Sequence, residues 1–181
     1  MADNFNYAGL IEDMQGNPNK YYGLYGGNTS KLKKDYSYNF ITGGDIDCLS
    51  YLKLVLRKVK KLDYCLVTTW TMSSEDIYQF EDFIKSGAVK KFDFYIGETY
   101  KGWHKQEYGK LEQVAKMCKG KAIGCANHSK IIAGYSKDFY FALQASANIN
   151  TNQRIETACL TVSKELFKFY FDYFDGIKSY E

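Results

Sequence analysis

Two pairs of residues, each spaced by two positions, carry most of the chemistry that this sequence offers. His128 and Lys130 lie in Asn127-His-Ser-Lys-Ile-Ile, at the expected start of a strand. Side chains at positions i and i+2 of a strand project from the same face, so an imidazole and an ammonium would point into one site. An imidazole can attack phosphorus while an ammonium holds the anionic oxygens. The pair therefore predicts attack on a phosphodiester.

A second group of polar residues follows the apolar strand expected over residues 139–145. Ser146 and Asn148 are again two positions apart and offer a hydroxyl and an amide to phosphate oxygens. Glu156 comes next, and a carboxylate that accepts from one imidazole nitrogen fixes the tautomer and leaves the other nitrogen free to attack. The second histidine of the chain, His104, lies in a polar segment beside lysines, has no Lys two positions later, and is expected to be solvated.

The elements that must position these residues alternate between strands and helices. The chain has 181 residues, 45% of them hydrophobic and 25% charged, so we expect one domain over 1–181 and exclude disordered and fibrous classes. Residues 1–44 are rich in Asn, Gly and Tyr, with short strands expected near 19–27 and 36–41, and have no assigned role. Helices are expected at 47–60, 73–87, 107–119 and 162–174. Further strands are expected at 64–70, 91–97, 122–126, 130–134 and 138–145. The alternation predicts an α/β sandwich with a mixed β-sheet.

The ordered set His-x-Lys, Ser-x-Asn and Glu, each at its own strand or strand end, resembles the phospholipase D superfamily. Within it, the chain is most similar to the small single-motif, endonuclease-like branch. The resemblance implies a phospholipase D-like α/β/α sandwich and a phosphodiesterase that needs neither metal nor cofactor and forms a phosphohistidine. The chain departs from the family pattern at two positions: Tyr135 stands where an Asp is usual, and Ala145 stands where a Gly is usual.

Members of this family use two histidines, one that attacks phosphorus and one that protonates the leaving oxygen. This chain has one motif, so the resemblance implies a homodimer whose two copies share one active site. In the implied roles, His128 is the nucleophile or the acid and Glu156 orients an imidazole. The phosphate is held by Lys130, Ser146 and Asn148.

Nucleic acid is the substrate that we expect. The net charge of +3 weakly favours an anionic partner. Lysines 31, 33 and 34 and the basic cluster 57–61 could follow a nucleic-acid backbone. The aromatic residues Tyr21, Tyr22, Tyr25, Trp70 and Trp103 could stack on bases.

Two other functions remain open from the residues. A non-catalytic nucleic-acid-binding or assembly module is favoured by Tyr135 and disfavoured by the retention of the other motif residues. A lipid phosphodiesterase needs an apolar access surface, and no amphipathic interfacial helix stands out.

A zinc site at Cys118, Cys125 and His128 lacks a nearby fourth ligand. The glycines at 23–27 lack the Lys-Ser/Thr ending of a phosphate-binding loop.

We expect the protein to be cytoplasmic. The N-terminus shows no basic segment followed by an apolar one, and no apolar run approaches the ~18 residues needed to span a bilayer. The five cysteines include no C-x-x-C pair, which suits buried free thiols in a reducing compartment.

Overall fold

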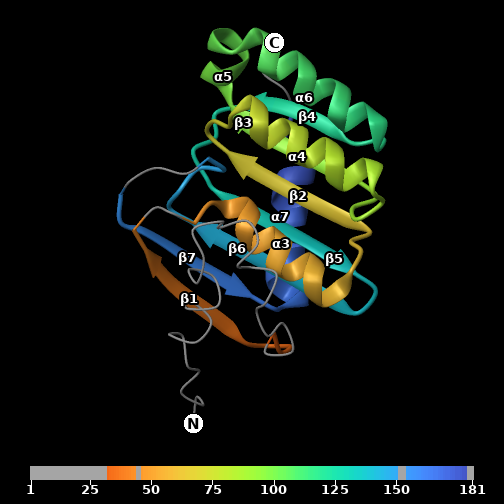
Figure 1. The fold of residues 1–181 in the computed structure, drawn as a ribbon, viewed down its shortest axis with the longest axis vertical. Coiled ribbons are helices and arrows are strands. Elements are labelled where there is room, and N and C mark those ends of the chain that lie inside the picture. Colours follow the sequence, from red (N-terminus) through yellow and green to blue (C-terminus); the bar gives the residue numbers. More distant parts are fainter. Residues whose placement is uncertain (1–31, 44–45, 151–153, 179–181) are drawn as a thin grey trace.

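The structure is a computed structural model that describes residues 32–43, 46–150 and 154–178. Within these residues a seven-stranded mixed sheet is covered by helices on both faces (Figure 1). The strands are β1 (Ser37–Thr42), β2 (Tyr64–Thr69), β3 (Phe92–Gly97), β4 (Lys121–Cys125), β5 (Ile131–Ser136), β6 (Phe139–Ala145) and β7 (Glu156–Thr161). The helices are α3 (Cys48–Val59), α4 (Ser74–Lys85), α5 (Glu98–Trp103), α6 (Lys105–Met117) and α7 (Lys164–Asp175). The predicted α/β sandwich with a mixed sheet is confirmed.

The strand order explains why one edge of the sheet collects the polar segments. The order is β1-β7-β6-β5-β2-β3-β4, with β2, β3 and β4 parallel to one another and the remaining pairs antiparallel. As a result β2, β3, β4 and β6 end, and β5 and β7 begin, at the same edge, on the left in Figure 1. We call this the site edge.

Two separate apolar layers hold the sheet. On one face, α3, α4 and α6 cover a core that includes Phe80, Phe92 and Phe94. On the other face, α7 covers a smaller, largely aromatic cluster that includes Phe167 and Phe174. The strands β2 and β3 are buried along their whole length, as continuous apolar runs predict.

The helix starts follow from local capping. Asp47 accepts from the backbone amide of Ser50 at 2.6 Å at the start of α3, and Ser73 with Asp76 forms a capping box at the start of α4. The segment 98–103 is a short helix, α5, which the sequence did not predict. The buried Tyr100 accounts for it, since its hydroxyl donates to the carbonyl of Met72 at 3.1 Å and draws the segment onto the core.

Some predicted features fall away from the site edge or outside the described residues. The strand expected near 19–27, the tyrosines at 21, 22 and 25, and Lys31 lie outside the described residues. The basic cluster 57–61 spans the C-terminal end of α3 and leads toward the start of β2, so it lies at the opposite edge of the sheet from the first residue of β5. In the part of the chain that the structure describes, no helix is long and apolar enough to cross a membrane.

Candidate active site

His128 and Lys130 are brought together at the site edge, as their spacing predicts. They lie in the segment between β4 and β5, where Lys130 is one residue and His128 three residues before the first residue of β5. The Lys130 ammonium nitrogen lies 3.0 Å from Nδ1 and 3.5 Å from Nε2 of the imidazole, and it donates to the His128 carbonyl at 2.5 Å. The His128 ring is exposed to solvent and Lys130 is half-buried. An incoming phosphate can therefore meet both groups.

A buried amide fixes the backbone around His128. Asn127 is 8% exposed, and its Nδ2 donates to the carbonyls of Thr69 at 3.1 Å and Tyr95 at 3.0 Å, near the ends of β2 and β3. Its Oδ1 accepts from the amide of Ser129 at 3.0 Å and from the hydroxyl of Ser129 at 2.5 Å. The Asn127 side chain thus fixes the backbone on both sides of His128, at Asn127 itself and at Ser129. Sequence reasoning missed Asn127, because its partners lie far away along the chain.

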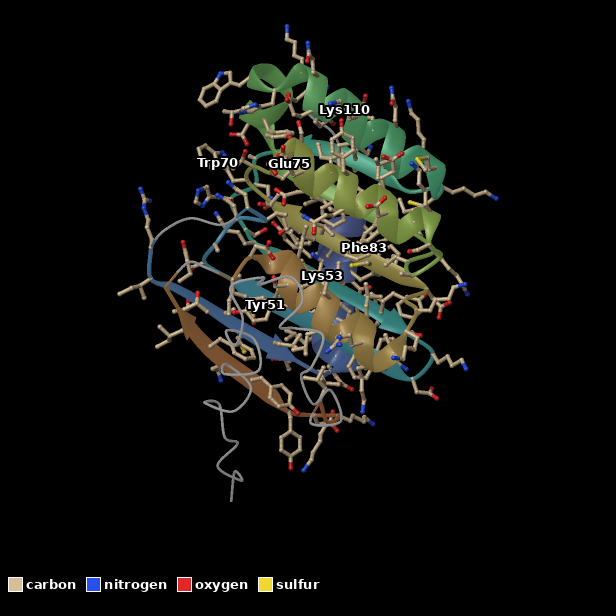
Figure 2. The ribbon with its side chains drawn as sticks, in the orientation of Figure 1. Tyr51, Lys53, Trp70, Glu75, Phe83 and Lys110 are labelled. Atoms are coloured by element: carbon tan, nitrogen blue, oxygen red, sulfur yellow. The ribbon has the colours of Figure 1, made fainter. Side chains whose placement is uncertain are left out.

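Trp70 lies against the imidazole. The centroids of the Trp70 and His128 rings are 5.5 Å apart at an interplanar angle of 46°, and Figure 2 shows Trp70 at the end of β2. A glycine makes room for it, because a Cβ at Gly97 would lie 2.4 Å from Cδ1 of Trp70 and 2.9 Å from its carbonyl oxygen. The sequence singled out Trp70 as a stacking residue, and the structure brings it to the histidine. Trp103, in α5, is largely exposed.

Ser146 and Glu156 meet at the next strand pair. The Ser146 hydroxyl donates to the Glu156 carboxylate and accepts from the amide of Thr157 at 2.9 Å. The Ser146 amide donates to the carbonyl of Thr157 at 2.9 Å, which extends the β6–β7 ladder by one step. Ser146 is therefore held at the site edge by two hydrogen bonds to its hydroxyl and one from its backbone amide. That Glu156 orients an imidazole stays a prediction.

Asn148 links the second polar segment to the first. Its Oδ1 accepts from the Thr69 hydroxyl at 3.2 Å, and the same hydroxyl oxygen accepts from the amide of Ile149 at 3.3 Å. Because the carbonyl of Thr69 accepts from Asn127, both motif segments are hydrogen-bonded to one residue at the end of β2. The structure thus brings the His-x-Lys and Ser-x-Asn segments into one site through Thr69, which the sequence did not single out.

The electrostatics of the site centre on Lys130. Burial lowers the pKa of its ammonium, and the nearby carboxylate of Glu156 opposes this shift. Cys48 lies in the first turn of α3, where its thiol donates to the carbonyl of Ala147 at 3.3 Å. Burial, followed by the nearby Asp47, raises the pKa of the Cys48 thiol. The thiol is thus neutral at physiological pH, and Lys130 is the cation of the site.

Tyr135, the main departure from the family pattern, is remote from His128. It lies four residues along β5 from Ile131, which is roughly 13 Å at 3.3 Å per residue. Its ring stacks with those of Tyr64 and Tyr140, at centroid distances of 6.1 and 5.5 Å, and contacts Phe167 of α7 edge-on at 5.4 Å. In this chain the position belongs to the aromatic core under α7.

His104 is built into a helix junction. It lies between α5 and α6, its ring stacks on Tyr100 at a centroid distance of 5.0 Å, and its backbone carbonyl accepts from the amide of Tyr108 at 2.8 Å. Its ring is exposed, as the sequence predicted. These contacts give His104 a structural role at the junction of α5 and α6, apart from the motif residues.

The mixed sheet and the helices on both of its faces form an α/β/α sandwich, with the polar segments gathered at one edge. A solved structure with this fold is that of polyphosphate kinase from Porphyromonas gingivalis, with a TM-score of 0.57 and 13% sequence identity. The match covers 94% of this chain and 26% of that chain, so this protein spans about a quarter of that kinase's length. No family model and no curated protein sequence matches the chain.

Proposed function

We propose that the protein is a metal-independent phosphodiesterase of the phospholipase D type that cleaves DNA or RNA through a phosphohistidine at His128. The convergence of two polar segments on Thr69 carries this proposal. It puts an exposed imidazole beside an ammonium, with the Ser146 hydroxyl and the Asn148 amide on the neighbouring segment. Such a set can supply both a nucleophile and a cradle for the non-bridging oxygens.

The reaction proceeds in two balanced steps. In the first, a ring nitrogen of His128 attacks phosphorus, a P–N bond forms, and the bond from phosphorus to the leaving alcohol oxygen breaks. A second imidazole gives that oxygen its proton. In the second step, water attacks phosphorus while the same imidazole takes a proton from it, and the P–N bond breaks. Throughout, Lys130, Ser146 and Asn148 hold the non-bridging oxygens.

The second imidazole comes from a second copy of the chain. The sequence has two histidines, and His104 stacks on Tyr100 at a helix junction and lacks a following lysine. A homodimer in which two His128 residues face one phosphate therefore completes the site. A test is to mix wild-type chains with His128→Ala chains after unfolding. Mixed dimers should be inactive, so activity should fall faster than the fraction of wild-type chains.

Nucleic acid is the proposed substrate because of charge and aromatic residues. The chain has a net charge of +3, and Trp70, beside His128, offers a π-face to a base. The basic cluster 57–61 lies at the opposite edge and does not support a track to the site. The non-catalytic alternative rested on Tyr135, which belongs to the aromatic core under α7.

The activity is tested by hydrolysis of bis(p-nitrophenyl) phosphate and of single- and double-stranded DNA and RNA in EDTA. Wild type should cleave, and His128→Ala should lose roughly 10³-fold or more in rate, whereas His104→Ala should keep most of the activity. Cleavage that survives His128→Ala contradicts the proposed mechanism. A folded wild type that binds nucleic acid and cleaves none of these substrates would instead be a binding module.

A further inference from the structure

A cavity of about 500 Å³ opens beside His128, on the face of the sheet covered by α7. The segment between β4 and β5 forms one wall, with Asn127 and His128. The other wall is the C-terminal half of α7, which contributes Phe169, Tyr170, Tyr173 and Phe174. A molecule in this cavity therefore contacts the proposed nucleophile and a row of aromatic rings at the same time.

Two of the aromatic residues in this wall are buried, and two are exposed to solvent. Tyr170 and Phe174 are buried, and the Phe174 ring packs on Tyr95 of β3 at a centroid distance of 5.0 Å. Phe169 and Tyr173 are four residues apart and lie on one side of the helix. They are 63% and 65% exposed, although rings of this size are usually buried. Two large rings thus stay open to solvent next to the site.

The position of α7 indicates which kind of chemical group the aromatic wall of the cavity binds. The helix α7 crosses the face of the sheet, so that its last turn lies against β3 and β4, where Phe174 packs on Tyr95 and Asp175 pairs with Lys121. Tyr173 and Phe174 of that turn line the cavity. That end of a helix carries partial negative charge, which disfavours a phosphate there. An uncharged, flat group is favoured, while the phosphate stays with Lys130. Just beyond α7, Lys178 adds a cation at the rim of the cavity.

We propose that this cavity binds the nucleobase of the nucleoside attached to the scissile phosphate, with Phe169 and Tyr173 as the stacking residues. This inference rests on the proposed function and narrows its substrate to nucleotides whose base is unpaired. A base presents a flat π-face to such rings and stacks on them regardless of sequence. The volume is within the range of pockets that hold small organic ligands.

The test uses a dinucleotide with one phosphodiester, thymidylyl-thymidine, and two analogues that each lack one base. In wild type, removal of the base that occupies the cavity should lower kcat/KM by roughly 5- to 150-fold, and removal of the other base should have a smaller effect. In a Phe169→Ala/Tyr173→Ala double variant the dinucleotide and both analogues should react at similar rates. Tyr78→Ala is the matched control: Tyr78 is a 51% exposed tyrosine on α4, on the other face of the sheet. This variant should keep the full preference for the base.

Several results would overturn the inference while leaving the proposed function standing. One is equal cleavage of all three substrates by wild type. Another is a double variant that keeps the base preference, or one that becomes monomeric, which would make the α7 face an interface between copies. Cleavage of a short-chain phosphatidylcholine that the double variant loses, without any base preference, would assign the cavity to an acyl chain.

Failure of the proposed function itself gives a different result, because wild type would then cleave none of the three substrates. In that case the cavity is tested by binding of 2-aminopurine nucleoside monophosphate, whose fluorescence falls when its base stacks. Quenching by wild type and not by the double variant supports a base site. Absence of quenching by wild type rejects it.

Discussion

Replacement of Asn127 by alanine should destabilise the protein and disable the site together. The change removes both donors that serve the carbonyls of Thr69 and Tyr95, residues that are fully buried. It also removes the acceptor for Ser129, which is half-exposed and can turn to water. We therefore count the two buried carbonyls, at about 1 to 1.5 kcal/mol each, and expect a loss of about 2 to 3 kcal/mol in the free energy of unfolding.

Urea unfolding measures this loss directly. With a slope of about 2 kcal/mol per molar urea, the midpoint should fall by about 1 to 1.5 M. The Asn127 side chain fixes the backbone on both sides of His128. In its absence kcat/KM should also fall by about 10²-fold, the usual effect of misplacing a catalytic group by about 1 Å. Asn39→Ala is the matched control, since Asn39 is exposed on β1, and it should change stability by less than about 0.5 kcal/mol.

The variant Asn127→Asp separates shape from hydrogen bonding. A carboxylate has nearly the shape of the amide but no donors, and it would face two carbonyl oxygens. It should therefore be at least as destabilising as alanine at neutral pH. If Asn127→Ala unfolds at the wild-type urea concentration and keeps its activity, the amide does not position His128 and the reasoning is wrong.

Three further predictions follow from neighbouring contacts. Gly97→Ala should displace Trp70, because the new Cβ would lie 2.4 Å from its Cδ1; we expect a loss of about 1 to 3 kcal/mol and a changed tryptophan emission spectrum. Burial lowers the pKa of Lys130, so its positive charge, present below that pKa, is lost as pH rises before an ordinary lysine near 10.4 would lose it. Inhibition by inorganic phosphate should weaken over that alkaline range in wild type and not in Lys130→Arg, which stays charged. Finally, a thiol reagent should modify the half-buried Cys159 quickly in the native protein and all five cysteines in urea, because Cys48 and the other three are buried and burial raises the pKa of the Cys48 thiol.

The sequence predicted most of the fold because the signals were local. The buried strands β2 and β3 are continuous apolar runs, and the capping box at Ser73 marks the start of α4. The helix α5 was missed because its six residues contain no sustained apolar period, and burial of Tyr100 decides its shape. Such tertiary contacts cannot be derived from propensity.

The site was predictable in part for the same reason. His128 and Lys130 are neighbours in sequence, so their contact follows from spacing. Asn127 was missed because its amide joins residues 58 and 32 positions away. Phe169 lies in the last helix that the sequence predicts, but its exposure could not be predicted, because periodicity does not show how much of an apolar face the sheet covers. Only the placement of α7 shows that its last turns extend beside the site.

The most direct test of the central claim is to trap the covalent intermediate on His128. Wild-type protein mixed with excess dinucleotide is quenched in alkali, which preserves a P–N bond, and is digested with trypsin. Cleavage after Lys121 and Lys130 releases the peptide 122–130, in which His128 is the sole histidine. This peptide should gain the mass of a nucleoside phosphoryl group, and the gain should be absent from His128→Ala. Turnover accompanied by an adduct on another peptide, or by none while His128→Ala stays active, would contradict the central claim.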